Sequence, residues 1–310
     1  MPGAVLIVNP SASRVTPEVT LEVERTLAAA GPLETVLTER PRHAAELAAE
    51  ACLRCERIYV LSGDGGYNEV VNGIAGEVAV GFLPGGSTSV LPRALGLPRD
   101  PVACAGLLAR GSERRIGLGR VNGRRFTFSA GLGVDAELVR RVDELGRDDG
   151  LRAGDLAFAR SLAGIFARRL GRFVPTMTVL GRERVAFALV ANCDPYSFVG
   201  RLPLHVAPAA RFELGLDLVA PRRLEPWLVP QLARWLLQGK GQTTSRHILY
   251  VHDADEIAIE CDFPMPLQAD GEDLGDVREA RFEAERDALT ALVPGKRDNS
   301  VHGPGRSRRR

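Results

Sequence analysis

Three short turns rich in glycine, serine and asparagine carry the residues best suited to chemistry. They read NPSAS at 9–13, SGDGGYNE at 62–69 and PGGSTS at 84–89. A glycine turn between a strand and a helix offers backbone N–H groups and the positive end of a helix dipole to an anion. Asp64 lies inside the second turn, where a carboxylate repels phosphate unless a cation lies between them. The pattern predicts a polyphosphate site with Mg²⁺ at Asp64; the alternative is tight turns in which Asp64 only caps a helix.

The sequence does not indicate other common kinds of site. It contains no G-x-x-x-x-G-K-[ST] loop and no protein-kinase glycine loop with its H-R-D and D-F-G partners. The five cysteines favour a reducing compartment, and the C-x-x-C formed by Cys52 and Cys55 has no second pair. The five histidines lack metal-ligand spacing, so no transition-metal site is predicted.

The segments around these turns alternate between strand and helix patterns up to about residue 118. We expect strands at 4–8, 33–39, 57–63 and 78–84, and helices at 19–31, 43–55, 68–76 and from near Val90. This alternation predicts a parallel sheet with helices on both faces, in which ligands bind at the carboxyl ends of the strands. All three turns lie at those ends.

From about residue 119 the pattern changes to short strand-like segments separated by glycine, proline and asparagine, such as FTFSAGLGV, RVAFALVAN and DEIAIECD. Helical patterns interrupt them near 151–171 and 226–238. This texture predicts a second, mainly antiparallel β domain. Residues 296–310 are polar and basic, which predicts a disordered tail.

Read in order, the motifs resemble the diacylglycerol kinase and sphingosine kinase family of lipid kinases, especially its soluble bacterial members. The resemblance runs from Val5 to about Pro294. It rests on NPSAS, Thr38, SGDGGYNEVVNG, PGGSTSVLPRALGLP, FTFSAGLGVDAELV, and LQADGEDL followed by RFEAERDALTALVP.

This resemblance implies a fold, a domain division and a reaction. An N-terminal phosphofructokinase/NAD-kinase-like α/β domain with a parallel sheet is expected at 1–118, completed by about 279–295. A C-terminal antiparallel β-sandwich domain that binds the lipid substrate is expected at 119–278. The implied reaction transfers the γ-phosphoryl group of ATP to a lipid hydroxyl with Mg²⁺, in the cleft between the domains. Diacylglycerol is the first expected substrate, followed by a sphingoid or another lipid alcohol.

The resemblance also assigns residues. The nucleotide side comprises Asn9, Pro10, Ser11, Thr38, Gly63, Asp64, Gly65, Gly66, Asn68, Glu69, Gly85, Gly86 and Ser87. Glu272, Asp64 and Asp270 are the catalytic candidates, and Asp64 is also the metal ligand. The general base is Glu272 by analogy with bacterial diacylglycerol kinases and Asp64 by analogy with sphingosine kinases, and the sequence leaves both open.

Two further aspartates each have two interpretations. Asp135 matches a family aspartate that faces the substrate head group, and it also suits the N-cap of the helix that follows. Asp270 is either a carboxylate that supports Glu272 or a turn former. We expect Asp135 to bind substrate and Asp270 to serve the catalytic group.

Several positions depart from the family pattern. The threonine usual after GGDG is Gly66, and the first glycine of that signature is Ser62, as in sphingosine kinases. The asparagine usual after PGGT-x is Ser89, and the following Ala-Arg reads Pro92-Arg93. The usual Asp-Asp-Gly of the second domain, which helps to hold a structural Mg²⁺, reads Glu213-Leu214-Gly215. These changes suggest one alternative to a lipid kinase, a catalytically weak lipid- or nucleotide-binding regulator. A second alternative is an NAD kinase-like enzyme, because NAD kinases share a GGDG turn.

Composition bounds the partners and the location. Lys plus Arg is 40 against 39 acidic residues, so no overall charge favours nucleic acid. No stretch reaches the roughly 18 apolar residues of a membrane span, and the N-terminus lacks signal-peptide features. We expect a cytoplasmic enzyme, peripheral to the membrane, whose partners are ATP and a lipid; a homodimer is left open. The amphipathic stretch at 156–173 and the pair Trp227 and Trp235 suit either a membrane surface or a core.

Overall fold

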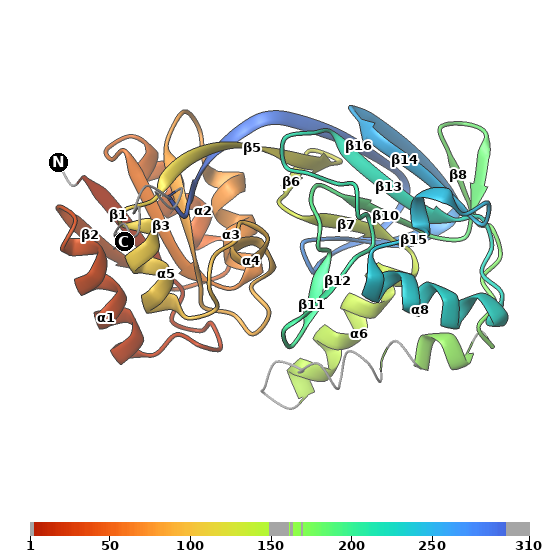
Figure 1. The fold of residues 1–310 in the computed structure, drawn as a ribbon, viewed down its shortest axis with the longest axis horizontal. Helices are drawn as coiled ribbons and strands as arrows, with labels where there is room; N and C mark the ends of the chain where they lie inside the picture. Colours follow the sequence, from red (N-terminus) through yellow and green to blue (C-terminus); the bar gives the residue numbers. More distant parts are fainter. Residues whose placement is uncertain (1–2, 149–160, 162–163, 169, 296–310) are drawn as a thin grey trace, which may run out of the picture.

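The computed structural model describes residues 3–148, 161, 164–168 and 170–295 of the 310-residue chain. The chain folds into two halves joined by two long strands (Figure 1). The parallel half comprises residues 3–108, and the antiparallel half comprises residues 124–269. The predicted tail and most of the helical insert expected near 151–171 lie outside the described residues. No helix in the described part is long and apolar enough to cross a membrane.

The parallel half contains the predicted parallel sheet, with strand order β4-β3-β1-β2. Its strands are β1 (Ala4–Val8), β2 (Leu33–Leu37), β3 (Arg57–Ser62) and β4 (Ala79–Pro84), and its helices are α1 (Pro17–Ala28), α2 (His43–Cys52), α3 (Asp64–Gly73), α4 (Val90–Ala94) and α5 (Pro101–Leu108). Right-handed crossovers place α1 on one face and α2 and α3 on the other. Strands β3 and β4 are buried almost throughout, as expected of a sheet that is covered on both faces.

Local signals explain where the helices begin. Thr16 caps α1 by accepting a hydrogen bond from the Val19 N–H at 3.3 Å, and Asp100 caps α5 in the same way at 2.7 Å. Helix α3 differs from the expectation, because it begins at Asp64 rather than at Asn68. The glycines that were expected to form an open turn are therefore the first turn of α3. No side chain caps this helix, whose N-cap residue is Gly63.

The antiparallel half contains the predicted second β region around its own core. Its strands are β6 (Arg124–Phe126), β7 (Ser129–Leu132), β8 (Met177–Val179), β9 (Glu183–Val185), β10 (Ala188–Ala191), β13 (Leu216–Pro221), β14 (Ile248–Ala254) and β15 (Glu256–Ala269), with the hairpin β11 (Ser197–Val199) and β12 (Leu202–Leu204). Helices α6 (Val134–Asp148) and α8 (Val229–Gln238) lie below the sheet in Figure 1. The core contains Phe126, Met177, Leu218 and Phe282.

Two strands cross from one half to the other, as the arch at the top of Figure 1 shows. β16 (Glu272–Val293) pairs antiparallel with β15 near its start and parallel with β4 at Thr290 and Ala291. β5 (Ser112–Val121) runs antiparallel to β16. One continuous strand thus carries Glu272 at its first residue and completes the parallel sheet at its other end. Strand β5 passes through residue 118, so it spans the expected domain boundary.

The hairpin β11–β12 makes a second connection between the halves. The guanidinium of Arg93 in α4 stacks over the Phe198 ring, 3.4 Å from its centroid. Arg99 donates a hydrogen bond to the Gly200 carbonyl at 3.3 Å, and also one to the Ser87 carbonyl at 3.2 Å. The third turn, PGGSTS at 84–89, is therefore tied to the antiparallel half as well as to its own sheet.

Candidate active site

The three turns meet at the carboxyl edge of the parallel sheet. β3 lies between β1 and β4, and the Asn9 N–H donates to the Leu61 carbonyl at 3.0 Å. The Gly85 N–H donates to the Ser62 carbonyl at 2.7 Å, while the Arg14 N–H donates to the Gly85 carbonyl at 2.9 Å. Backbone hydrogen bonds thus join the turns after β1, β3 and β4 into one surface, as the sequence predicted.

Two glycines let these turns approach each other. A Cβ atom on Gly86 would lie 2.8 Å from the Gly63 Cα, and one on Gly85 would lie 2.9 Å from the Ser62 carbonyl oxygen. Neither backbone could yield without moving a strand. Ser89 closes the same turn in the left-handed conformation, with φ of 47°, and its hydroxyl accepts a hydrogen bond from the Gly86 N–H at 3.1 Å. These glycines serve turn-to-turn packing.

Asp64 lies in the first turn of α3 and faces the start of α4. Its Oδ1 accepts hydrogen bonds from the Val90 N–H at 2.8 Å and from the Leu91 N–H at 3.4 Å. The carboxylate therefore caps α4 and links the second and third turns. Among the described residues, no three His, Cys, Asp or Glu side chains group around a metal position. A single carboxylate with substrate phosphates nevertheless fits Mg²⁺, which usually takes one or two protein carboxylates and keeps several waters.

Five other expected nucleotide residues lie along the same edge. Asn9 folds its side chain over the first turn and accepts a hydrogen bond from the Ser11 N–H at 3.0 Å. Ser11 and Ser87 are exposed, and Thr38 follows β2, where its N–H donates to the Val8 carbonyl at 2.8 Å. Pro10 is exposed beside them.

Two expected nucleotide residues of α3, Asn68 and Glu69, make hydrogen bonds that join elements of the fold. The Glu69 carboxylate accepts hydrogen bonds from the Arg42 N–H at 2.9 Å and the Ala44 N–H at 3.2 Å, so it caps α2. Asn68 is fully buried, and its Nδ2 donates to the Asp270 Oδ2 at 2.9 Å and to the Arg125 carbonyl at 3.0 Å. Asn68 thus fastens α3 to the antiparallel half.

Asp270 anchors the turn between β15 and β16. It has a φ of 50° and is 3% exposed, and its carboxylate accepts hydrogen bonds from the Thr127 N–H at 2.6 Å and the Phe128 N–H at 2.9 Å. The Thr127 hydroxyl, the Ser129 N–H and Asn68 complete the set. Burial raises the pKa of this carboxyl, while hydrogen bonds from Phe128, Asn68 and Thr127 lower it. These hydrogen bonds fix the turn that carries Glu272.

Glu272 lies against the first turn of α3. A Cβ atom on Gly65 would lie 2.8 Å from the Glu272 Oε1, so glycine at position 65 allows this contact. Arg124 forms an ion pair with the same carboxylate, and it donates to the Asn68 Oδ1 at 2.8 Å. The two side chains of the pair are about one third exposed, at 29% and 34%. The structure therefore brings together the second turn, SGDGGYNE, and the turn between β15 and β16 that carries Asp270 and Glu272 (the acidic turn). The two turns lie far apart in the sequence.

Asp135 lies deeper in the antiparallel half. Helix α6 begins at Val134, so Asp135 is inside the helix and is not its N-cap. Its carboxylate accepts hydrogen bonds from the Tyr196 hydroxyl, at 2.5 Å, and from Gln268. Burial raises the pKa of this carboxyl, and the two hydrogen bonds lower it. Asp135 is thus a buried carboxylate held by two uncharged donors.

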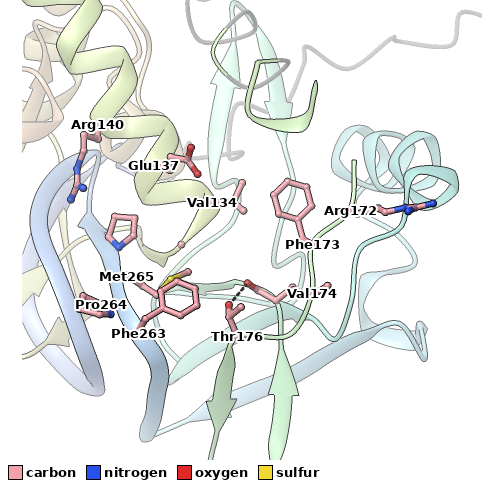
Figure 2. Close-up of a pocket in the computed structure, with 13 residues that line it drawn as sticks. Val134, Glu137, Arg140, Arg172, Phe173, Val174, Thr176, Phe263, Pro264 and Met265 are labelled. Carbon is pink, nitrogen blue, oxygen red and sulfur yellow. Dashed lines mark hydrogen bonds between the residues drawn. The ribbon is translucent and has the colours of Figure 1, made fainter. Parts of the chain in front are cut away.

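A cavity of about 460 Å³ opens on the other side of α6. Its walls are largely apolar, with Val134 on α6, Phe173 before β8, and Phe263 and Met265 on β15 (Figure 2). The polar lining residues Glu137, Arg140, Arg172 and Thr176 lie around the same space. Arg140 pairs with Asp273 at 2.8 Å, so one wall of the cavity is joined to the residue next to Glu272.

Comparison with known proteins identifies the parallel half. Residues 3–121 match the family described as the diacylglycerol kinase catalytic domain. A diacylglycerol kinase of Bacillus subtilis is 40% identical over 104 residues, which are 32% of this chain and 34% of the relative. A diacylglycerol kinase of Staphylococcus carnosus is 30% identical over 149 residues, 43% of this chain and 45% of the relative. In sequence, residues 3–121 are therefore similar to the catalytic domain of diacylglycerol kinases.

The likeness in fold extends further than the likeness in sequence. A solved diacylglycerol kinase from Bacillus anthracis superposes with a TM-score of 0.70 at 18% identity, covering 94% of this chain and 96% of that chain. Another solved chain from this organism gives a TM-score of 0.75 at 21% identity, over 94% and 97% of the two chains. At these identities the match shows the fold. The sequence matches span only 34% and 45% of the two curated relatives named above.

Three features of the structure were not predicted from the sequence. Arg124, the partner of Glu272, carries no motif that singles it out from Arg125 beside it. The roles of Asn68 and Glu69 in joining elements depend on helices that only the fold brings near. Glu213, in the Glu213-Leu214-Gly215 segment that departs from the family's Asp-Asp-Gly, forms an ion pair with Arg114.

Proposed function

We propose that this protein is an ATP- and Mg²⁺-dependent lipid kinase that transfers the γ-phosphoryl group to a lipid hydroxyl. The observation that carries the proposal is the contact between Glu272 and the first turn of α3 at Gly65. A carboxylate beside an anion-binding helix end places a proton acceptor next to a phosphoryl donor. The matched family supports the kinase class.

The nucleotide phosphates would lie on the surface formed by the three turns. The first-turn N–H groups of α3 have no partner within the helix, so they are suited to phosphate oxygens. Asn9, Ser11, Thr38 and Ser87 border that surface and supply hydroxyl and amide groups. Asp64 would hold Mg²⁺, which when bound neutralises charge on the transferred phosphoryl group.

Glu272 would accept the proton of the attacking hydroxyl. The Arg124 guanidinium pairs with this carboxylate and also donates a hydrogen bond to Asn68, while Asp270 fixes the turn that carries Glu272. Phosphoryl transfer needs positioning and charge neutralisation more than covalent chemistry, and this arrangement supplies both. Asp64 is the other candidate for the base, and the two differ in their predicted response to substitution.

The acceptor would be a lipid alcohol, with diacylglycerol as the first choice. The apolar cavity beside α6 has the size of a small-molecule site, for which about 300–1,000 Å³ is usual, and it adjoins the Glu272 turn through Arg140 and Asp273. Val174 and Phe263, both on its lining, are 59% and 48% exposed, which suits an opening towards a bilayer surface. We therefore propose peripheral attachment to the membrane and residues 119–278 as the lipid-binding domain.

One assay separates this proposal from its alternatives. The purified protein is incubated with labelled ATP, Mg²⁺ and a total lipid extract, and products are resolved by thin-layer chromatography. A labelled lipid spot that is lost in Asp64→Asn supports a lipid kinase. Formation of NADP from added NAD would indicate an NAD kinase-like enzyme, and no transfer to either acceptor would indicate a binding protein. Repeating the assay with pure diacylglycerol and a sphingoid base identifies the lipid class.

A further inference from the structure

Ser62 carries a buried hydroxyl for which the described residues provide no hydrogen-bond partner. It is the last residue of β3 and is 2% exposed, and its Oγ has no hydrogen-bond partner. Its carbonyl oxygen already accepts hydrogen bonds from the Tyr67 hydroxyl and the Gly85 N–H, both at 2.7 Å. Buried hydroxyls are nearly always hydrogen-bonded, because an unpaired one loses its hydration without compensation. Such a hydroxyl at a ligand-binding edge points to a partner that arrives with the ligand.

The hydroxyl lies against the first turn of α3. A Cβ atom on Gly66 would lie 2.1 Å from the Ser62 Oγ and 2.8 Å from the Ser62 Cβ. The Ser62 side chain therefore occupies the volume that any side chain at position 66 would need. Gly66 is the third residue of the ten-residue helix α3, whose N-cap Gly63 offers no side-chain acceptor. Ser62 is thus the hydroxyl that packs directly on this helix end.

We propose that Ser62 is a phosphate-binding residue, and that Ser62 and Gly66 form a reciprocal pair in which the strand supplies the hydroxyl that the helix cannot carry. The inference rests on the proposed nucleotide site. An anion seated on the first-turn N–H groups lies close to residue 66, and rotation about one side-chain bond turns the Ser62 O–H towards it. Hydrogen bonds to charged groups are stronger than those between neutral groups, so the ligand compensates for the unpaired hydroxyl.

Binding of ATP provides the first test, with calorimetry as the readout. Ser62→Ala should weaken binding about tenfold to a hundredfold, as expected for loss of one hydrogen bond to a charged group. Thr35→Val is the matched control, because Thr35 in β2 of the same sheet also has a buried hydroxyl without a partner. That control should bind as the parent does. An affinity of Ser62→Ala within about twofold of the parent would overturn the inference.

A double-mutant cycle tests the pair without depending on catalysis. Gly66→Ser alone should lower Tm and abolish ATP binding, because its Cβ meets the Ser62 side chain. Ser62→Gly with Gly66→Ser moves the hydroxyl from the strand to the helix, and it should recover both Tm and most of the ATP affinity that Ser62→Gly loses. Additive effects of the two substitutions would overturn the reciprocal pairing. Failure of the parent itself to bind ATP would overturn the proposed function, and the phosphate role of Ser62 with it.

Discussion

The two sides of the candidate site, the glycine turns and the turn that carries Glu272, differ in the groups that make their contacts. On the glycine-turn side, backbone atoms make the contacts: Gly86 packs on Gly63, and the amides at the start of α4 bind Asp64. On the side of the β15–β16 turn, charged and polar side chains make them: the buried Asp270 carboxylate holds its own turn, and the partly exposed Arg124 pairs with Glu272. The first side should therefore fail when a side chain is added, and the second when a charge or a hydrogen-bonding group is removed.

The largest effect is expected where the two sides touch. Gly65→Val places a Cβ atom 2.8 Å from the Glu272 Oε1 and puts bulk over the first turn of α3. Transfer should fall by at least about a hundredfold, as small misplacements of catalytic groups do, and stabilisation of the protein by ATP should vanish. Thermal shift with and without ATP, together with the kinase assay, measures both. Gly106→Ala is the control, since a Cβ there comes no nearer than 3.9 Å to another residue.

Retained ATP stabilisation in Gly65→Val would mean that α3 does not bind the phosphates. Retained transfer would mean that phosphoryl transfer does not depend on the position of the Glu272 carboxylate.

Asp64→Asn separates charge from capping on the glycine-turn side. Asparagine keeps the Oδ1 that accepts from Val90, so Tm should change little, but it removes the charge that would hold Mg²⁺. We expect kcat to fall about a hundredfold to a thousandfold, the range for loss of one group that stabilises charge in a transition state. Asp100→Asn is the matched control, because Asp100 caps α5 in the same domain. Equal kcat in the two variants would remove the metal role from Asp64.

Asn68→Ala tests the join between the two sides. It leaves the buried Asp270 carboxylate without one donor and removes one of the two side-chain amides that donate to the Arg125 carbonyl, so unfolding free energy should drop by about 1–3 kcal/mol. Denaturation in urea measures the loss. The control Asn72→Ala removes a neighbouring amide of the same helix that is less buried, and its cost should be smaller. A larger loss of unfolding free energy in Asn72→Ala would mean that exposed contacts of α3, and not the buried Asn68, hold α3 to the antiparallel half.

The smallest effect concerns pH and Asp135. Burial raises the folded pKa of this carboxyl above its unfolded value of 3.8. The folded state then holds the proton more tightly, so this contribution to stability is complete below the unfolded pKa and is lost as pH rises through the folded pKa. Asparagine does not titrate there. The stability of Asp135→Asn relative to the parent should therefore rise across that interval, and parallel curves in urea denaturation would contradict the assignment.

The difference between the two sides also explains what the sequence could predict. Glycine turns at strand ends are local features, so the parallel sheet and the convergence of the turns followed from the pattern around Gly63 and Gly85. The start of α3 was misplaced because Asp64, Gly65 and Gly66 form a helical turn whose glycines allow close contacts and not an open loop.

Contacts that span the chain left no local signal. Glu69 was expected at the nucleotide, yet it caps α2, because helix packing brings the Arg42 and Ala44 amides to its carboxylate. Nothing in the sequence around Arg124 indicates a partner, because its ion pair is with Glu272 on β16, which lies far away in the sequence. Ser62 and Gly66 are separate departures in the sequence, and only the backbone geometry shows that they occupy one volume.

Glu272→Gln tests the central claim most directly. Glutamine keeps the shape of the side chain but cannot accept the lipid hydroxyl's proton, so kcat should fall by at least about a hundredfold while the Kd for ATP stays within about twofold. Glu183→Gln, on β9, is the control, because Glu183 also pairs with an arginine at similar exposure, 41% against 34%. A kcat within about threefold of the parent would contradict the account and move the role of general base to Asp64.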